Sequence, residues 1–404
     1  MTQAPLRLNP VLGVLALLAT AALCGLPLVS SAPNRLVAGE GVFLLALQST
    51  WGWPVALPLA GFLALLALPF TAWLPPRRSV LACGGLALWL MPALLWLAGA
   101  QAAVAAAQAG AAAPLTTTSL ASGFWLTMLL LGLMVAESLQ RLRAGVAARA
   151  AVGLLGLVLF GGLLASGVCD ALSLFKEAAN RPDGLVIAMA QHLHIVGLAL
   201  AFALGLGLPL GWLAAHRPGV GRAVLPVLNV LQTIPSIALF GLLMAPLAWL
   251  ASTVPALGRA GISGVGMAPA VLALTLYGLL PVVRATWAGL AQLPPAVLQA
   301  ALGLGMSAGQ RLLRVELPLA LPVVLGGVRT AAVQAVGLAA VTALIGAGGL
   351  GAVIFEGLFS AAQDVVLLGV LPLVALGAAI GSVLQMLIGW AQRATHRHPG
   401  AVHD

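Results

Sequence analysis

The stretch that decides the fold is residues 187–214, IAMAQHLHIVGLALAFALGLGLPLGWLA, which lies in an uncharged run between Asp183 and Arg217. Crossing a hydrocarbon core of about 30 Å at about 1.5 Å per residue takes roughly 20 apolar residues in an α-helix. Because the bilayer core holds no water, a spanning backbone must satisfy its own hydrogen bonds. We therefore predict a transmembrane helix here.

Similar uncharged runs recur along the 404 residues, because the charged residues are few and clustered. Hydrophobic residues make up 62% of the chain and charged residues 7%, whereas soluble domains have about a quarter charged residues. This composition excludes a soluble enzyme, a nucleic-acid-binding domain and a disordered chain. It indicates an all-α polytopic membrane protein with about ten transmembrane helices. We place them at residues 10–29, 55–74, 79–99, 123–140, 150–167, 187–214, 224–250, 269–290, 319–345 and 365–391.

The cations set the predicted orientation of these spans. With the N-terminus in the cytoplasm, only four of the 18 Lys and Arg residues lie outside (Arg35, Lys176, Arg181 and Arg259), and Arg329 lies within a span. Cytoplasmic loops of membrane proteins carry an excess of Lys and Arg. We therefore expect both termini in the cytoplasm. No basic stripe with interleaved aromatic residues, typical of nucleic-acid binding, is found.

The chain divides into a membrane region at 1–184 with about five spans, a second membrane domain at 185–393 with five more, and a cytoplasmic tail at 394–404. The first span leaves two alternatives open. The small residues Val29–Ala32 resemble a signal-peptide cleavage site, whereas the long apolar run and the following Pro33 favour a retained helix. The later spans keep their orientation in either case.

Metal ligands and catalytic groups do not cluster in the sequence. Cys24, Cys83 and Cys169 are too scattered for a zinc site or a disulfide framework. His192 and His194 are two residues apart on a predicted helix, so their side chains point in different directions. We interpret them as packed or interfacial residues, and we expect neither a bound metal nor a catalytic residue.

The longest predicted cytoplasmic loop of the second half runs from Gln292 to Pro318 and carries helix start and stop signals. Pro294-Pro295 favours the first turn of a short helix over 296–304. Gly305 can end that helix in a left-handed conformation. The segment is therefore more than a simple turn.

A second short helix is predicted after it. Ser307 and Gln310 have the spacing of a capping box, and Pro318 is expected to stop the helix before the next span. With Arg311 and Arg314 exposed, the two helices form either a docking element at the membrane surface or an ordinary solvated loop.

The same loop resembles the signature loop of the permease subunits of bacterial ABC importers. That pattern is Glu-Ala-Ala, three residues, Gly, nine residues, Ile, one residue and Leu-Pro. The corresponding residues here are Gln299, Ala300, Ala301, Gly305, Val315, Leu317 and Pro318, with every spacing kept. Gln299 replaces the acid, so an ion pair of that acid is lost while a hydrogen bond remains possible. Val315 replaces Ile conservatively.

Further motifs extend the resemblance over about residues 185–393. They are Gln191-His192-Leu193, Leu208-Pro209-Leu210-Gly211, the segment 228–236 (LNVLQTIPS), the segment 274–281 (LTLYGLLP) and the segment 346–351 (GAGGLG). These segments are similar to the branch that imports glycine betaine, choline, carnitine and related osmoprotectants. The extra N-terminal spans resemble the Yeh-type osmoprotectant permeases. The resemblance implies an ABC type-1 (MetI-like) permease domain at 185–393.

The resemblance also implies partners and a location. A permease of this kind pairs with an identical or a different permease in the bacterial inner membrane, docks on cytoplasmic ABC ATPase subunits through the 292–318 loop, and receives substrate from a periplasmic binding protein. The chain has no Walker A motif, and its single lysine, Lys176, lies in an outer loop. We therefore expect ATP and Mg²⁺ to be used by the partner ATPase, and this chain to be a translocation subunit rather than an enzyme. Membrane lipid is a further expected partner, and nucleic acid is not.

Polar residues within the spans are candidates for the translocation path. They are Gln232, Thr233, Pro235, Ser236 and Tyr277. An aromatic face attracts quaternary ammonium groups, which favours Tyr277, with a packed core residue as the alternative. The polar residues around Pro235 either contact substrate or satisfy backbone groups that the proline leaves free.

The main alternative function is an ion-coupled secondary transporter of small solutes. Such carriers place ionisable residues within their spans. None of the nine acids lies at the centre of a predicted span, which argues against a carrier and against a membrane-embedded enzyme. Arg329 is expected to snorkel or to bond carbonyl groups near the cytoplasmic end of its span.

Overall fold

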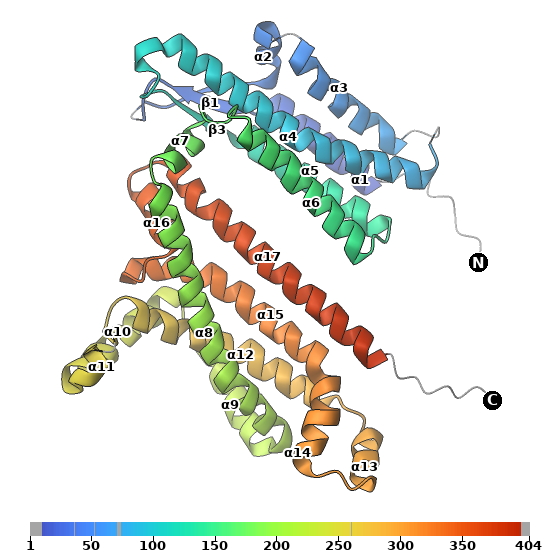
Figure 1. Ribbon diagram of the computed structural model, residues 1–404, viewed down its shortest axis with the longest axis vertical. Coiled ribbons are helices and arrows are strands. Elements are labelled where there is room, and N and C mark those ends of the chain that lie inside the picture. The colour runs from blue at the N-terminus through green and yellow to red at the C-terminus, as the bar shows by residue number, and fades with distance from the viewer. Residues whose placement is uncertain (1–9, 36, 52, 71–73, 260, 397–404) are drawn as a thin grey trace. The chain divides into compact units, whose positions relative to one another are not determined.

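The computed structural model describes residues 10–35, 37–51, 53–70, 74–259 and 261–396. The chain forms two compact units, Met1–Asn180 and Arg181–Asp404 (Figure 1). Arg7 and residues 397–404 of the predicted tail, which include Arg397, lie outside the described residues.

The first unit is built mainly of long apolar helices. They are α1 (Pro10–Gly25), α2 (Leu44–Trp51), α3 (Trp53–Ala67) with the 3₁₀ turn η1 (Leu68–Phe70), α4 (Pro76–Ala109) with the 3₁₀ turn η2 (Gly110–Ala112), α5 (Ser122–Arg141), α6 (Val146–Ala165) and α7 (Ser173–Ala179). Helix α4 extends well past the predicted end at residue 99, because the Ala-rich segment that follows continues the helix.

A small antiparallel sheet in this unit departs from the all-helical expectation. It consists of β1 (Val29–Ala32), β2 (Glu40–Val42) and β3 (Thr117–Leu120), in the order β2-β1-β3. The central strand β1 is the segment that resembles a cleavage site, and Val29 pairs with Val42 on one side and Leu120 on the other. Strands this short carry almost no alternating pattern, so periodicity could not reveal them.

The charged loop before the second unit is ordered against this sheet. Lys176 of α7 donates to the carbonyl oxygens of Ala113 and Thr116, at 3.1 and 3.2 Å. The buried carboxylate of Glu177 pairs with Arg35. These contacts join α7 to the residues that follow β1 and to those that precede β3.

The second unit is also helical. Its elements are α8 (Pro182–His216), α9 (Pro218–Thr233), α10 (Ser236–Thr253), α11 (Pro255–Arg259), α12 (Met267–Ala291), α13 (Pro295–Gly303), α14 (Ala308–Arg311), the π-helical turn η3 (Leu312–Glu316), α15 (Leu317–Val341), the 3₁₀ turn η4 (Thr342–Ile345), α16 (Leu350–Phe359) and α17 (Gln363–His396). Helix α12 is the core of the unit and packs against α8 and α15, while α15 packs against α17 (Figure 1).

Small residues set the close approach of α8 and α12. A Cβ atom added to Gly211 of α8 would lie 2.8 Å from the carbonyl oxygen of Val283, and one added to Gly207 would lie 2.8 Å from a methyl group of Val282. Helices in a membrane gain stability from such backbone proximity, since lipid competes for ordinary apolar contacts. The glycines of α8 are therefore packing residues.

Eight helices of the described chain are long and apolar enough to cross a membrane, and three shorter apolar helices add to them at Pro10–Gly25, Val55–Ala67 and Leu350–Phe359. Helix α6 has no buried residue, and Leu157 on it is 73% exposed. Such surfaces are stable in lipid and not in water. The predicted polytopic helical class is confirmed.

The predicted single span at 224–250 is wrong. The structure breaks it into α9 and α10, with Ile234 in an extended conformation (φ −70°, ψ 127°). The cause is Pro235, which disfavours the helical conformation of the residue before it and cannot donate a backbone hydrogen bond. The residues on both sides of the break are apolar, so a hydropathy pattern does not reveal it.

Candidate functional site

The 292–318 segment begins with a short, well-terminated helix. Helix α13 starts with Pro295 in its first turn and ends at Gly303, and Gly305 adopts φ +71°. The Gly305 amide donates to Leu302 at 2.9 Å and the Met306 amide donates to Ala301 at 3.2 Å. This pair of bonds is a Schellman motif, which requires the left-handed conformation at Gly305. The predicted role of Gly305 in ending the helix is confirmed.

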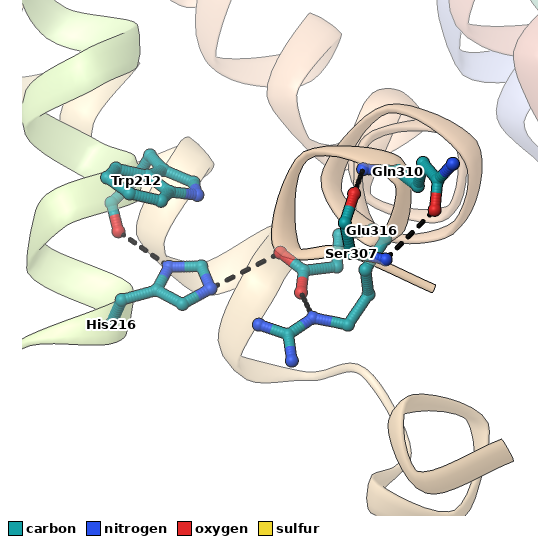
Figure 2. Close-up of polar contacts among 6 residues, drawn as sticks. Trp212, His216, Ser307, Gln310 and Glu316 are labelled. Atoms are coloured by element: carbon teal, nitrogen blue, oxygen red, sulfur yellow. Dashed lines mark hydrogen bonds and ion pairs between the residues drawn. The ribbon is translucent and has the colours of Figure 1, made fainter. Parts of the chain in front are cut away.

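Helix α14 begins at the predicted capping box. The Ser307 hydroxyl accepts from the Gln310 amide at 3.3 Å, and the Ser307 amide donates to the Gln310 side chain at 2.9 Å (Figure 2). Two backbone donors that would otherwise be unsatisfied are therefore bonded. Both ends of the turn between α13 and α14 are fixed by local bonds.

Pro318 does not stop the second short helix, contrary to the prediction. Helix α14 continues through η3 into α15, and the Leu317 amide donates to the carbonyl of Leu312, five residues back. In a regular helix the Pro318 ring would crowd the carbonyl of Arg314. A π-helical turn is wider and accommodates the proline without ending the helix. The 292–318 segment is thereby joined to α15 by continuous helix.

Glu316 lies at the end of this π-helical turn and is only 3% exposed. Its Oε1 accepts from Arg311 Nε at 2.6 Å, and its Oε2 lies 3.3 Å from Nε2 of His216, the last residue of α8. His216 Nδ1 lies 3.0 Å from the carbonyl oxygen of Trp212, and the Trp212 and His216 rings are 4.8 Å apart (Figure 2). A carboxylate this buried is stable only when it is paired.

The residues that match the permease pattern lie on this one segment, with different exposures. Gln299 and Ala300 are exposed. Ala301 is buried by other residues of this chain, so its side chain is not available to contact a partner. Val315 is half-buried, while Leu317 and Pro318 are exposed.

Large apolar side chains protrude from the same segment. Leu302 is 55% exposed, Leu304 76% and Leu313 66%. Leu302 and Leu304 lie outside the helices that are long and apolar enough to cross a membrane, whereas Leu313 lies near the start of one of them, Ala308–Ile345. Exposed apolar groups on an ordered segment between spans are typical of a protein docking surface.

Two of the candidate path residues, Gln232 and Tyr277, bond backbone carbonyl groups next to prolines. Pro281 in α12 leaves the carbonyl of Tyr277 without a helical donor, and Gln232 Nε2 donates to that carbonyl at 2.8 Å. The Tyr277 hydroxyl in turn donates to the carbonyl of Ile234, at the break before Pro235.

Other path candidates differ in exposure. Tyr277 is 5% exposed and packs in a core cluster, Thr233 and Pro235 are exposed, and Ser236 is half-buried. Thr233 donates to the carbonyl of Val230 at 2.7 Å. Their role in a path stays a prediction.

The GAGGLG segment packs on α8 through its backbone. Gly346, Gly348 and Gly349 adopt φ near +80°, and the Gly349 amide donates to Gln191 Oε1 at 3.1 Å. His192 is fully buried beside it, with Nε2 3.2 Å from the carbonyl of Val336. His192 is a packed residue, which agrees with the interpretation from the sequence.

Arg329 reaches across to α17. Its Nη1 donates to Gln385 Oε1 at 2.9 Å, so its partner is a side-chain amide rather than a backbone carbonyl. Among the described residues, no group of three or more His, Cys, Asp or Glu is placed to hold a metal ion. The expectation that this chain binds neither metal nor cofactor remains a prediction.

Sequence reasoning missed His216 and gave Glu316 no role. The two residues are a hundred positions apart in the chain and meet only through the fold. No local spacing links them. Glu316 is the only acid between Gln292 and Pro318, close to Arg311 and Arg314, and this was the signal that the sequence offered.

Comparisons with known proteins match both parts of the chain. The N-terminal domain of the ABC transporter permease YehY matches residues 7–175, and the binding-protein-dependent transport system inner membrane component matches residues 207–397. The osmoprotectant import permease protein OsmW of Salmonella typhimurium is 41% identical, over 49% of this chain and 86% of the relative. The glycine betaine/carnitine/choline transport system permease protein OpuCD of Bacillus subtilis is 34% identical, over 50% and 81%. An inward-facing structure of the MetNI methionine ABC transporter is 23% identical over 51% and 95%, with a TM-score of 0.44.

Proposed function

Because the chain belongs to the family of binding-protein-dependent transport system inner membrane components, we propose that it is the permease subunit of an ATP-driven importer for an osmoprotectant such as glycine betaine or choline. The printed names of its relatives support this substrate class, since they are osmoprotectant and glycine betaine/carnitine/choline permeases. We propose that the 1–184 region adds YehY-type spans to a MetI-like permease domain at 185–393.

The observation that carries the coupling proposal is the 292–318 segment. It combines exposed Leu302, Leu304 and Leu313 with helix ends that are fixed by a Schellman motif and a capping box. An ordered segment with protruding apolar groups can receive force from a partner without unfolding. A flexible solvated loop could not.

The proposed mechanism is a rigid-body movement. Closure of the ATPase subunits pushes α13 and α14, and the push passes into α15 because α14, η3 and α15 form continuous helix. Helix α15 packs on α12 and α17, so these helices tilt with it and change access to the path. Cytoplasmic ATPases hydrolyse ATP, and a periplasmic binding protein delivers the substrate.

The proposed path runs along the α9–α10 break, where Gln232, Thr233, Pro235 and Ser236 lie and which Tyr277 of α12 contacts through its hydroxyl. Proline breaks concentrate the backbone freedom that a moving helix needs. In the conformation described here Tyr277 bridges α12 to this break through its hydroxyl. Opening of the path would separate that contact and expose the ring.

Proteoliposomes test this function directly. The purified chain is reconstituted with its partner ATPase and loaded binding protein, and uptake of labelled glycine betaine or choline is measured with and without ATP. We expect uptake only with all partners and ATP, with both termini on the ATPase side. Exchange of substrate by the chain alone would instead support an ion-coupled secondary transporter.

Variants of the exposed leucines link uptake to the 292–318 segment. Replacing Leu304 and Leu313 by Ser should abolish uptake and weaken binding of the ATPase, because apolar contact area is lost. Replacing the exposed Leu157 of α6 by Ala is the matched control and should leave ATPase binding unchanged.

A further inference from the structure

The His216–Glu316 contact joins two elements that the proposed mechanism must move together. Glu316 belongs to the 292–318 segment, where it pairs with Arg311, and His216 is the last residue of α8. Helix α8 packs closely along α12 through Gly207 and Gly211. A displacement of the segment that reaches His216 therefore reaches the core helix of the unit.

Both ring nitrogens of His216 face oxygen atoms of other residues. Its Nδ1 faces the carbonyl oxygen of Trp212 at 3.0 Å and its Nε2 faces Glu316 Oε2 at 3.3 Å. A carbonyl oxygen and a carboxylate oxygen are both acceptors, so each ring nitrogen must carry a proton to be attracted to its neighbour. The charged imidazolium is attracted to both neighbours, and the contact with Glu316 is an ion pair only in that state.

The surrounding charges make this contact specific to His216. Arg311 occupies the other carboxylate oxygen, Oε1, whereas Oε2 is buried and makes no hydrogen bond with any described residue, so that its 3.3 Å contact with His216 is one of charge alone. From α9, Arg222 donates to the carbonyl of Pro218 instead. Arg217 follows His216 directly in the chain. Loss of the His216 proton would leave Oε2 buried without a cation.

We propose that His216 and Glu316 form a proton-dependent positioning joint, which fastens the 292–318 segment to the cytoplasmic end of α8 and passes its movement into α12. The inference rests on the proposed coupling function and adds a residue outside the signature loop. The role of the two residues is to hold the segment in register with the spans.

A purely local role for Glu316 is the competing explanation. In that case Arg311 alone pairs the carboxylate within the π-helical turn, and His216 is incidental. Changes at His216 separate the two explanations, because they leave the Arg311 contact in place.

The test measures substrate transported per ATP hydrolysed in proteoliposomes between about pH 5 and 8, the range in which histidine changes its charge. His216→Leu removes the contact, and His216→Arg keeps a permanent cation. His194→Leu is the matched control, because His194 is another exposed histidine of α8. All variants use the same ATPase and binding protein, so the pH dependence of these two partners cancels when the variants are compared.

The joint predicts that transport per ATP in the wild-type protein falls as the pH rises, relative to His216→Arg, which stays high throughout. His216→Leu should be about tenfold lower than the wild type at low pH and insensitive to pH, in line with typical coupling free energies. His194→Leu should match the wild type. Melting temperatures measured in parallel identify any variant that fails to fold, and recovery by His216→Arg shows that position 216 tolerates substitution.

Equal transport per ATP and an equal pH profile in the wild type and His216→Leu would overturn the joint while leaving the proposed function intact. Absence of ATP-dependent uptake by the wild-type protein with all partners present would overturn the proposed function, and the role of the joint with it.

Discussion

Two glycines in the 292–318 segment should respond in opposite directions to the same added methyl group. Gly305 has φ +71°, whereas Gly303 is the last residue of α13 and has no positive φ. A Cβ atom at either position would meet no heavy atom within 4 Å. The backbone conformation is therefore the main difference between Gly305→Ala and Gly303→Ala.

The magnitude follows from that conformation. A left-handed backbone costs an L-residue about 1–2 kcal/mol, so Gly305→Ala destabilises the Schellman motif by that amount. Replacing Gly by Ala inside a helix gains about 0.5–1 kcal/mol, so Gly303→Ala stabilises α13. The two variants should differ by about 1.5–3 kcal/mol, or roughly 10- to 150-fold in local opening.

Hydrogen exchange of the amides of Gly305 and Met306, which donate to Leu302 and Ala301, measures this opening. Compared with the wild-type protein, the amides of residue 305 and Met306 should exchange faster in Gly305→Ala. In Gly303→Ala their exchange should be unchanged or slower. Transport per ATP should fall only in Gly305→Ala. Equal exchange at Met306 in the two variants would refute the reasoning.

Three further outcomes are expected. Tyr277→Phe removes the hydroxyl donor to the partly buried carbonyl of Ile234 and should lower the free energy of unfolding by about 0.5–1.5 kcal/mol, seen as a lower melting temperature. Gly211→Leu should disrupt the α8–α12 packing and prevent recovery of a monodisperse protein, because even a Cβ atom there lies 2.8 Å from the Val283 carbonyl; a normal yield and melting temperature would contradict this. Burial, followed by the charge of Asp170, raises the pKa of the Cys169 thiol, so maleimide labelling at Cys169 of the native protein should be slow at neutral pH, faster as the pH rises, and fast after denaturation.

The membrane spans could be predicted because they depend on local composition. The predicted span 269–290 corresponds to α12 (Met267–Ala291), and 365–391 corresponds to α17 (Gln363–His396). Charge marks where a helix leaves lipid, so gaps between charges indicate helices. Caps are equally local, which is why Ser307 and Gln310 were identified as a capping box.

The parts that could not be predicted depend on tertiary structure or on backbone detail. The four-residue strand β1 is stabilised by partners on both sides rather than by its own propensity. The helix breaks at Pro235, where Ile234 is extended, but it continues through Pro318, because the π-helical turn before Pro318 leaves room for the proline ring. This difference lies in the backbone conformation and not in the residue type. The contact between His216 and Glu316 is likewise formed by the fold of α8 against α15.

The most direct test of the central claim is photo-crosslinking from Leu304, which is 76% exposed on the 292–318 segment. A photoreactive amino acid is placed at Leu304, and as a control at Val227, an exposed residue of α9. The assembled transporter is irradiated with and without ATP. We predict a crosslink to the ATPase subunit from position 304, changed in yield by ATP, and none from position 227. Absence of any ATPase crosslink from position 304 in a transporter that still imports substrate would contradict coupling through this segment.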